Sequence, residues 1–175
     1  VFVSNHQMQQ YIREYSIPWS RCFVIENAIE SFDEFKWRQK WELFDYPNSR
    51  INLVYSSTPH RGLNILMAAY NKITQENPEL NIQLDVFSSF GLYGWSERDE
   101  SYRPLFDQIK NNPKATWHGA VDNDTVRTYL EKSHIWCLPS IWPETSCLAL
   151  IEAMASQNIC IHSNLGALYE TAMNN

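Results

Sequence analysis

The 175-residue sequence predicts an α/β fold in which a Rossmann-like parallel sheet carries helices on both faces. From Asn52 onward, short apolar runs alternate with longer segments of helical periodicity, which is the pattern of repeating β/α units. The composition, 44% hydrophobic and 19% charged with no low-complexity run, indicates a soluble globular protein. The length suits one domain with a substantial core and is too short for two.

The first 50 residues are expected to be less regular than the remainder. Before residue 26 we predict the end of a strand, a helix and a short strand, at Val1–Ser4, Asn5–Tyr15 and Cys22–Ile25. Between residues 30 and 50, Trp37, Trp41 and Phe44 recur at helical spacing, and we expect these side chains to pack against the domain.

The β/α units fill the rest of the chain. The predicted strands are Asn52–Tyr55, Ile82–Phe87, Thr116–Trp117, Ile135–Leu138 and Ile159–His162. The predicted helices are Leu63–Gln75, Tyr102–Asn111, Asp124–Lys132, Thr145–Ala155 and Ala167–Met173. Because the sequence stops within the last helix, we expect the domain to continue beyond residue 175.

Charge and hydropathy narrow the partners. The net charge of −6 and the scattered basic residues argue against nucleic acid, whose binding needs a basic stripe. The longest apolar runs, Ile135–Leu138 and Cys147–Ile151, fall short of the ~20 residues that cross a bilayer, so no transmembrane segment is expected. The four cysteines lack Cys-x-x-Cys spacing, which favours free thiols in a reducing compartment. We expect a cytoplasmic location, with peripheral membrane association open to the full-length protein.

Three common site motifs do not occur in the sequence. No Gly-x-Gly-x-x-Gly follows the first strand of the β/α units, and no P-loop is present. The Gly-x-Ser-x-Gly turn of serine hydrolases is missing as well. A simple dinucleotide fingerprint and a serine nucleophile are therefore not predicted.

The most informative segment runs from Pro139 to Ala155. Glu152 is the one charge in the apolar run from Cys147 to Ala155, and a buried carboxylate needs a partner because leaving it unpaired is costly. Two interpretations remain open from this feature alone. Glu152 faces a cleft and binds a hydroxylated ligand, or it is satisfied within the protein by backbone or an arginine.

The predicted start of this helix suits a diphosphate. Thr145 and Ser146 are good N-caps, and a helix N-terminus offers unpaired amides and the positive end of the dipole. Glu144 and Glu152 would be separated by ~12 Å along a helix axis. That is about the span from a sugar ring across a diphosphate to a ribose, so one carboxylate could accept hydrogen bonds from each ring.

Glu144 and Glu152, with Pro-Ser before and Glu-Ala-Met-Ala after, resemble the Glu-x7-Glu motif of retaining GT-B glycosyltransferases, group 1 or family 4-like. Other segments are similar to that family in the same order: Phe2-Val-Ser4 with Gln7, Val24-Ile-Glu-Asn27, Ser56-Ser-Thr-Pro-His-Arg61-Gly62-Leu63, His118-Gly119 and Gly166-Ala-Leu-Tyr-Glu170. The resemblance implies the carboxy-terminal half of a GT-B fold. Residues 1–30 would be the crossover segment from a missing amino-terminal domain, and residues 31–175 the nucleotide-sugar-binding domain, truncated at its carboxy-terminus.

The resemblance also implies roles for particular residues. Arg61 would grip the donor diphosphate, although a solvated turn residue is the simpler interpretation without the family. Glu144 would contact the transferred sugar, with Arg61 and Glu144 as the catalytic pair, and Glu152 would contact the ribose. The remaining donor contacts would be phosphate-binding amides at Thr145, Ser146, Cys147 and Leu148, and backbone beside the nucleobase at Gly119, Ala120 and Val121.

The implied activity is transfer of a hexosyl group from a UDP-sugar or GDP-sugar to a hydroxyl, with retention of configuration and without a cofactor or a metal. The acceptor would be a glycan, lipid or protein held mainly by the missing domain, so we expect the isolated chain to bind donor weakly and turn over little or nothing. Two alternatives are a non-catalytic nucleotide-sugar-binding module of a larger protein and a GT-B sugar-nucleotide epimerase. The Glu-x7-Glu flanks favour the transferase over the epimerase.

The sequence also departs from the family. Ser56 stands where many members have a second basic residue, and Thr145-Ser146-Cys147 replaces a glycine-rich stretch. Asn158 is expected to take the left-handed conformation that glycine would have used. Asp122-Asn123-Asp124 spells the Asp-x-Asp of metal-dependent glycosyltransferases, but an N-cap role for Asp explains it. His118 is expected near the base or sugar.

Overall fold

The computed structural model describes residues 1–173 and is built on one parallel sheet of five strands in the order β3-β2-β1-β4-β5. The strands are β1 (Ile51–Ser56), β2 (Ile82–Phe87), β3 (Ala115–Trp117), β4 (Ile135–Leu138) and β5 (Ile159–His162). The chain builds outward from β1 through β2 to β3, then returns to place β4 on the other side of β1. This reversal makes the β1/β4 boundary a topological switch point, where open α/β sheets bind ligands at the carboxyl ends of their strands.

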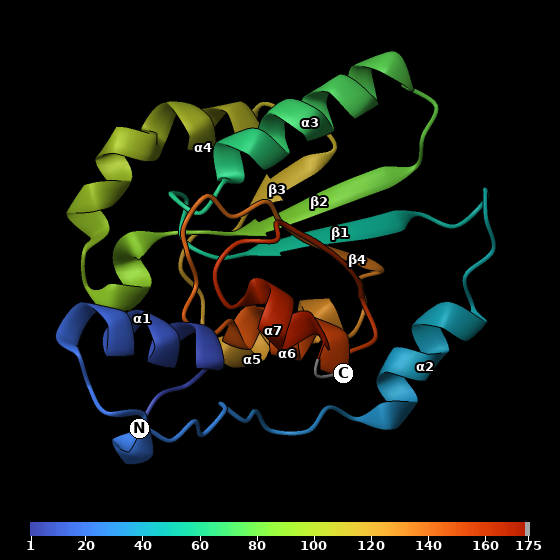
Figure 1. Cartoon of the computed structure of the whole chain (residues 1–175). Helices are drawn as coiled ribbons and strands as arrows, with labels where there is room; N and C mark the ends of the chain where they lie inside the picture. Colours follow the sequence, from blue (N-terminus) through green and yellow to red (C-terminus); the bar gives the residue numbers. More distant parts are fainter. Residues whose placement is uncertain (174–175) are drawn as a thin grey trace.

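Helices cover both faces of the sheet, as predicted (Figure 1). The α-helices are α1 (Asn5–Tyr15), α2 (Glu34–Glu42), α3 (Leu63–Glu76), α4 (Arg103–Lys110), α5 (Asn123–Leu130), α6 (Leu148–Ala155) and α7 (Leu168–Met173). Helices α3 and α4 lie on one face, whereas α5, α6 and α7 lie on the other. None of the helices described over residues 1–173 has the length and apolarity to cross a membrane.

The core lies between the sheet and its two helical layers. Trp136 of β4 is completely buried, and its indole Nε1 donates a hydrogen bond to Ser56 Oγ at 3.0 Å. Tyr55 of β1, Leu84 of β2 and Leu138 of β4 are also completely buried. The interior strand β4 is a short apolar run because both faces of a parallel sheet are covered, whereas the edge strand β5 leaves Ile159 and Ile161 more than half exposed.

Most predicted elements agree with the structure to within two residues, and four of them agree at both ends: α1, β2, β4 and β5. The two predicted strands at Val1–Ser4 and Cys22–Ile25 are wrong, because only one bridge, between Phe2 and Val24, forms there. Ser4 ends the extended stretch by capping α1, since its Oγ accepts a hydrogen bond from Gln7 N. The last two residues of the predicted domain 31–175 lie outside the described residues.

The left-handed residue after α6 is Gln157, with φ of 58°, and the prediction that placed it at Asn158 is wrong. Gln157 N donates to Met154 O and Asn158 N donates to Ala153 O, each at 2.9 Å. This pair of bonds is the Schellman ending of a helix, which puts the left-handed residue directly after the C-cap at Ser156. Asn158 is instead buried, and its Nδ2 donates to Leu130 O at 3.0 Å.

The amino-terminal end of helix α1 is held to α7 by the side chain of Glu170, which lies on α7. The Glu170 carboxylate accepts hydrogen bonds from Asn5 N at 2.7 Å and His6 N at 3.0 Å. These backbone donors have no partner within the helix, so the carboxylate satisfies them and matches the positive end of the dipole. They lower the pKa of Glu170, although burial alone would raise it.

Gly62 allows the turn after β1 to approach the loop after β4. It has φ of +90°, and a Cβ at this position would lie 1.9 Å from the carbonyl oxygen of Pro139. Any other residue would meet both backbone strain and a clash. The close approach sets the distance between the residues that follow β1 and those that follow β4.

Gly62→Ala should therefore destabilise the protein by roughly 3 kcal/mol or more, because left-handed strain of about 1–2 kcal/mol adds to overpacking of similar size. Gly94→Ala is the matched control, since Gly94 also has positive φ (+74°) but an added Cβ would meet nothing within 4 Å. We expect the control to lose only the strain contribution. Urea unfolding of both variants tests this, and equal losses would contradict the proposed contact with Pro139.

Candidate functional site

A cavity of about 330 Å³ opens at the carboxyl ends of β1 and β2, beside the loop that follows β4. Ser56 and Phe87 contribute from the strand ends, and the loop before α6 contributes Glu144. The first residues of α5 and α6 also line the cavity, as do Asn27, from the segment before α2, and Leu92 and Tyr93, from the short 3-10 helix after β2. The cavity therefore lies at the switch point of the sheet.

Arg61, which is partly exposed, and Glu144, which is buried, form an ion pair in this cavity. Arg61 Nε lies 3.0 Å from Glu144 Oε1, and the Glu144 residue is only 5% exposed. Burial raises the pKa of Glu144, while the Arg61 charge opposes that rise. The sequence predicted both residues for the site but did not predict their contact with one another.

Three side-chain atoms in the cavity wall are buried without a hydrogen bond from residues 1–173. They are Thr58 Oγ1, Arg61 Nε and Glu144 Oε1. The last two attract each other by charge, yet Nε–H is not aligned for a hydrogen bond. Buried polar atoms normally have partners, and two of these three are partnered by their mutual charge.

Helix α6 begins at Leu148, three residues later than predicted, with Cys147 as its N-cap. The N-cap roles predicted for Thr145 and Ser146 are therefore wrong, and the 12 Å helical spacing of the two acids does not apply. Glu144 forms a parallel bridge with Gly166 instead, and Ala167 N donates to Glu144 O at 2.7 Å. This pairing keeps residue 144 extended, so the helix cannot start until the chain has left the bridge.

Gly166 makes that bridge possible. It has φ of +64°, and an added Cβ would lie 2.6 Å from both the nitrogen and the oxygen of Glu144. The chain after β5 can therefore pack directly against the backbone of the loop between β4 and α6, which contains Glu144. The new helix start, at Cys147 and Leu148, lies in the cavity wall and has no side-chain hydrogen bond capping it.

Glu152, on the second turn of α6, faces a cavity, as the first interpretation of the sequence requires, and is also paired within the protein, as the second states. It lines the cavity and is 8% exposed. Its Oε1 also accepts a hydrogen bond from Asn123 Nδ2 at 2.9 Å and pairs with Arg127 Nη1 at 3.3 Å. Sequence reasoning missed both partners, although their i, i+4 spacing on α5 could have indicated a shared helix face.

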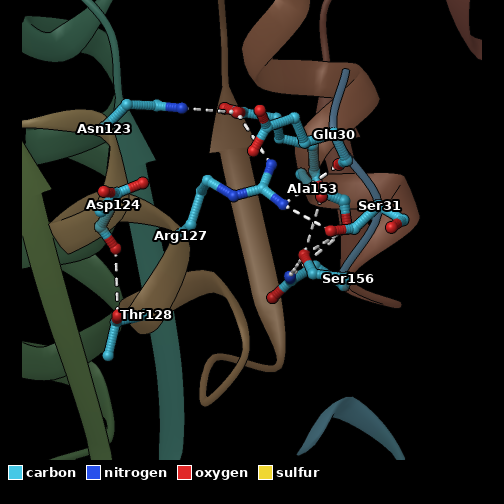
Figure 2. Close-up of polar contacts among 10 residues, drawn as sticks. Glu30, Ser31, Asn123, Asp124, Arg127, Thr128, Ala153 and Ser156 are labelled. Atoms are coloured by element: carbon cyan, nitrogen blue, oxygen red, sulfur yellow. Dashed lines mark hydrogen bonds and ion pairs between the residues drawn. The ribbon is translucent and has the colours of Figure 1, made fainter. Parts of the chain in front are cut away.

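Arg127 also holds the segment at residues 30–32 (Figure 2). Its Nη2 donates to Glu30 O at 3.0 Å and to Ser31 O at 2.9 Å. The guanidinium carbon lies 3.8 Å from the centre of the Phe32 ring. Figure 2 shows the side chain reaching from α5 to this segment, with Asn123 one turn earlier on the same helix.

The other predicted donor-binding residues separate into two groups. Those that line the cavity are Gly119, Val121, Ser146, Cys147 and Leu148. Ala120 and Thr145 are exposed and do not line it. Asn27 Nδ2 donates to Ser146 Oγ at 2.9 Å, which ties the amino-terminal segment to the site loop.

Ser56 lines the cavity, whereas His118 lies behind a lining residue. Ser56 Oγ accepts the Trp136 hydrogen bond, while His118 Nε2 lies 2.7 Å from Asp85 Oδ1. The His118 ring stacks on Phe87, which lines the cavity, with 4.4 Å between ring centres. His118 itself is not part of the lining.

The N-cap prediction for Asp122 is confirmed, because its side chain accepts a hydrogen bond from Thr125 N at 2.7 Å at the start of α5. Its pKa is lowered by this bond and by the Thr125 hydroxyl. Within residues 1–173, no group of three or more His, Cys, Asp or Glu side chains is placed to hold a metal ion.

The doubly wound sheet with a cavity at its switch point is the fold of a GT-B glycosyltransferase domain. The chain belongs to the family Glycosyl transferases group 1, whose model matches residues 35–175. No curated protein sequence matches the chain significantly.

Solved structures share this fold at low sequence identity. A glycosyltransferase from Rickettsia africae matches with a TM-score of 0.75 at 22% identity, over 99% of this chain and 46% of that one. The catalytic domain of Arabidopsis thaliana starch synthase IV, bound to ADP and acarbose, matches with a TM-score of 0.61 at 18% identity, over 97% and 40%. Anabaena HepE in complex with UDP-glucose matches with a TM-score of 0.63 at 13% identity, over 95% and 44%. The chain spans less than half the length of each.

Replacing Glu144 should change how the free energy of unfolding depends on pH. A folded-state pKa raised above 4.5, as for Glu144, adds stability that is complete below pH 4.5 and is lost as the pH rises through the folded pKa. The free energy of unfolding should therefore fall more steeply above pH 4.5 in the wild type than in Glu144→Gln. Urea unfolding at several pH values measures this. The exposed Glu79→Gln serves as the control, and parallel profiles for wild type and Glu144→Gln would refute the burial effect.

Proposed function

We propose that this chain is the donor-binding, carboxy-terminal half of a retaining glycosyltransferase that transfers a hexosyl group from a nucleoside diphosphate sugar to a hydroxyl acceptor. The observation that carries the proposal is the cavity itself. It gathers one cation, two buried carboxylates and an uncapped helix start at the switch point of the sheet. These are the groups that a diphosphate flanked by two sugar rings requires.

The phosphates would bind between Arg61 and the start of α6. As the bond to the leaving diphosphate breaks, negative charge grows on its oxygens, and a fixed guanidinium with uncapped amides stabilises that charge. Because α6 starts at Leu148, the amides involved would be those at Cys147 and Leu148. No metal and no cofactor take part in this scheme.

The two carboxylates would orient the rings on either side. Glu144 would accept hydrogen bonds from the transferred sugar, and Glu152 from the ribose. Gly119 and Val121 would border the nucleobase. Before the donor binds, Arg61 compensates the charge of the buried Glu144 carboxylate, since an uncompensated buried charge would cost several kcal/mol.

The acceptor, a glycan, lipid or protein, would be held mainly by an amino-terminal domain outside this chain. Residues 1–30 would then form the crossover segment between the two domains. We expect the isolated chain to bind donor and to turn over little or nothing. Structural neighbours were solved with ADP and with UDP-glucose, which carry different bases. The base that this chain prefers is therefore to be determined by a binding panel that also includes GDP.

A nucleoside diphosphate should raise the melting temperature of the chain, and Glu152→Ala should remove most of the rise. At ligand about tenfold above Kd, binding stabilises by about 1.4 kcal/mol, which is roughly 3–6 °C for a domain of this size. Thermal shift with UDP, GDP, ADP and their sugars measures this. Glu79→Ala, an exposed acid remote from the cavity, should keep the full rise. If no nucleotide raises the melting temperature of the wild type at millimolar concentration, the proposed function is overturned.

Arg61→Ala should weaken binding of the preferred nucleoside diphosphate by about 10- to 100-fold, since a charge-assisted hydrogen bond contributes roughly 1.5–3 kcal/mol. Binding of the corresponding nucleoside, which lacks phosphate, should change little. Arg38→Ala is the control, because Arg38 pairs with Glu34 on the surface of α2. Calorimetric titration compares the ligands, and an equal loss for the nucleoside would rule out a phosphate contact for Arg61.

A further inference from the structure

The two oxygens of the Glu152 carboxylate have different surroundings. Oε1 accepts from Asn123 Nδ2 at 2.9 Å and pairs with Arg127 Nη1 at 3.3 Å. For Oε2, no hydrogen bond forms with any residue in the described part of the chain. One oxygen is thus fixed by α5, and the other has no hydrogen-bonding partner among residues 1–173, while the Glu152 side chain lines the cavity.

Arg127 is itself fixed from behind. Its second nitrogen donates to the carbonyls of Glu30 and Ser31, and its plane rests on Phe32. Arg127 does not line the main cavity; it lines a neighbouring hollow of about 290 Å³ that shares Asn123, Leu148 and Glu152 with the main cavity. Arg127 is connected to the main cavity through the Glu152 carboxylate that it holds.

Asn123 stands at the front of the same arrangement. It is the first residue of α5, directly after the Asp122 cap, and it lines the main cavity beside Glu152. The one hydrogen bond of its side chain within residues 1–173 goes to Glu152. In the Asp122-Asn123-Asp124 motif, the first acid caps the helix, and the central amide is the residue that reaches the site.

We propose that Asn123 and Arg127 are positioning residues that lock the Glu152 carboxylate so that Oε2 is free to accept hydrogen bonds from the donor ribose. This inference rests on the proposed function and deepens it. A carboxylate held at one oxygen by two donors loses its rotational freedom before the ligand binds. Less ordering then remains to be done on binding, which raises affinity.

The test measures Kd for the tightest of UDP, GDP and ADP, and for its 2′,3′-dideoxy analogue, by calorimetry on the 175-residue chain. Asn123→Ala and Arg127→Lys should each raise the Kd of the nucleoside diphosphate by about 5- to 10-fold, because each removes part of the charge-assisted contacts that hold Glu152. Neither should weaken the dideoxy analogue, which lacks the hydroxyls that Oε2 would bind. In a Glu152→Ala background, both substitutions should cost nothing further.

Thr128→Ala is the matched control, because within residues 1–173 the Oγ1 of Thr128, on the same helix, bonds only to the backbone oxygen of Asp124. It should leave every affinity unchanged. Equal weakening of both ligands, no weakening of either, or an additive loss on top of Glu152→Ala would overturn the positioning role while leaving the proposed function intact. If the wild type binds no nucleoside diphosphate at all, the proposed function fails first, and this inference fails with it.

Discussion

The site depends on burying the Glu144 carboxylate against Arg61 at the switch point of the sheet. A buried charge is tolerated only if its partner is held in place, because desolvation alone costs several kcal/mol. Two glycines meet this condition: Gly62 brings the turn after β1 against Pro139, and Gly166 lets the chain after β5 pair with the Glu144 backbone. The pair at 3.0 Å therefore depends on three loops whose backbones approach closely at two glycines.

The same pairing explains the shape of the cavity. While Glu144 is bridged to Gly166 it stays extended, so α6 begins only at Leu148 and its uncapped end lies in the cavity wall. The start of α6 at Leu148 favours binding of the proposed ligand, since a helix start without a side-chain cap needs hydrogen-bond acceptors from elsewhere.

Local patterns predicted what local physics controls. The apolar run Ile135–Leu138 and the capped helix Asn5–Tyr15 were predicted to the residue, because burial and capping are visible in neighbouring positions. The late start of α6 was not, since Thr145 and Ser146 are good caps and the competing partner, Gly166, is distant in sequence. Likewise Glu152 was singled out by its apolar surroundings, whereas its partners on α5 belong to another helix.

Arg127 links two parts of the molecule that the sequence keeps far apart. Its guanidinium joins the carboxylate of Glu152 to the carbonyls of Glu30 and Ser31, just before the family-matched residues 35–175 begin. Moving that segment away from α5 would leave the guanidinium without two acceptors and without the Phe32 ring beneath it. The geometry at Glu152 and the path of the amino-terminal segment are therefore coupled through one side chain, so a change in either one would disturb the other.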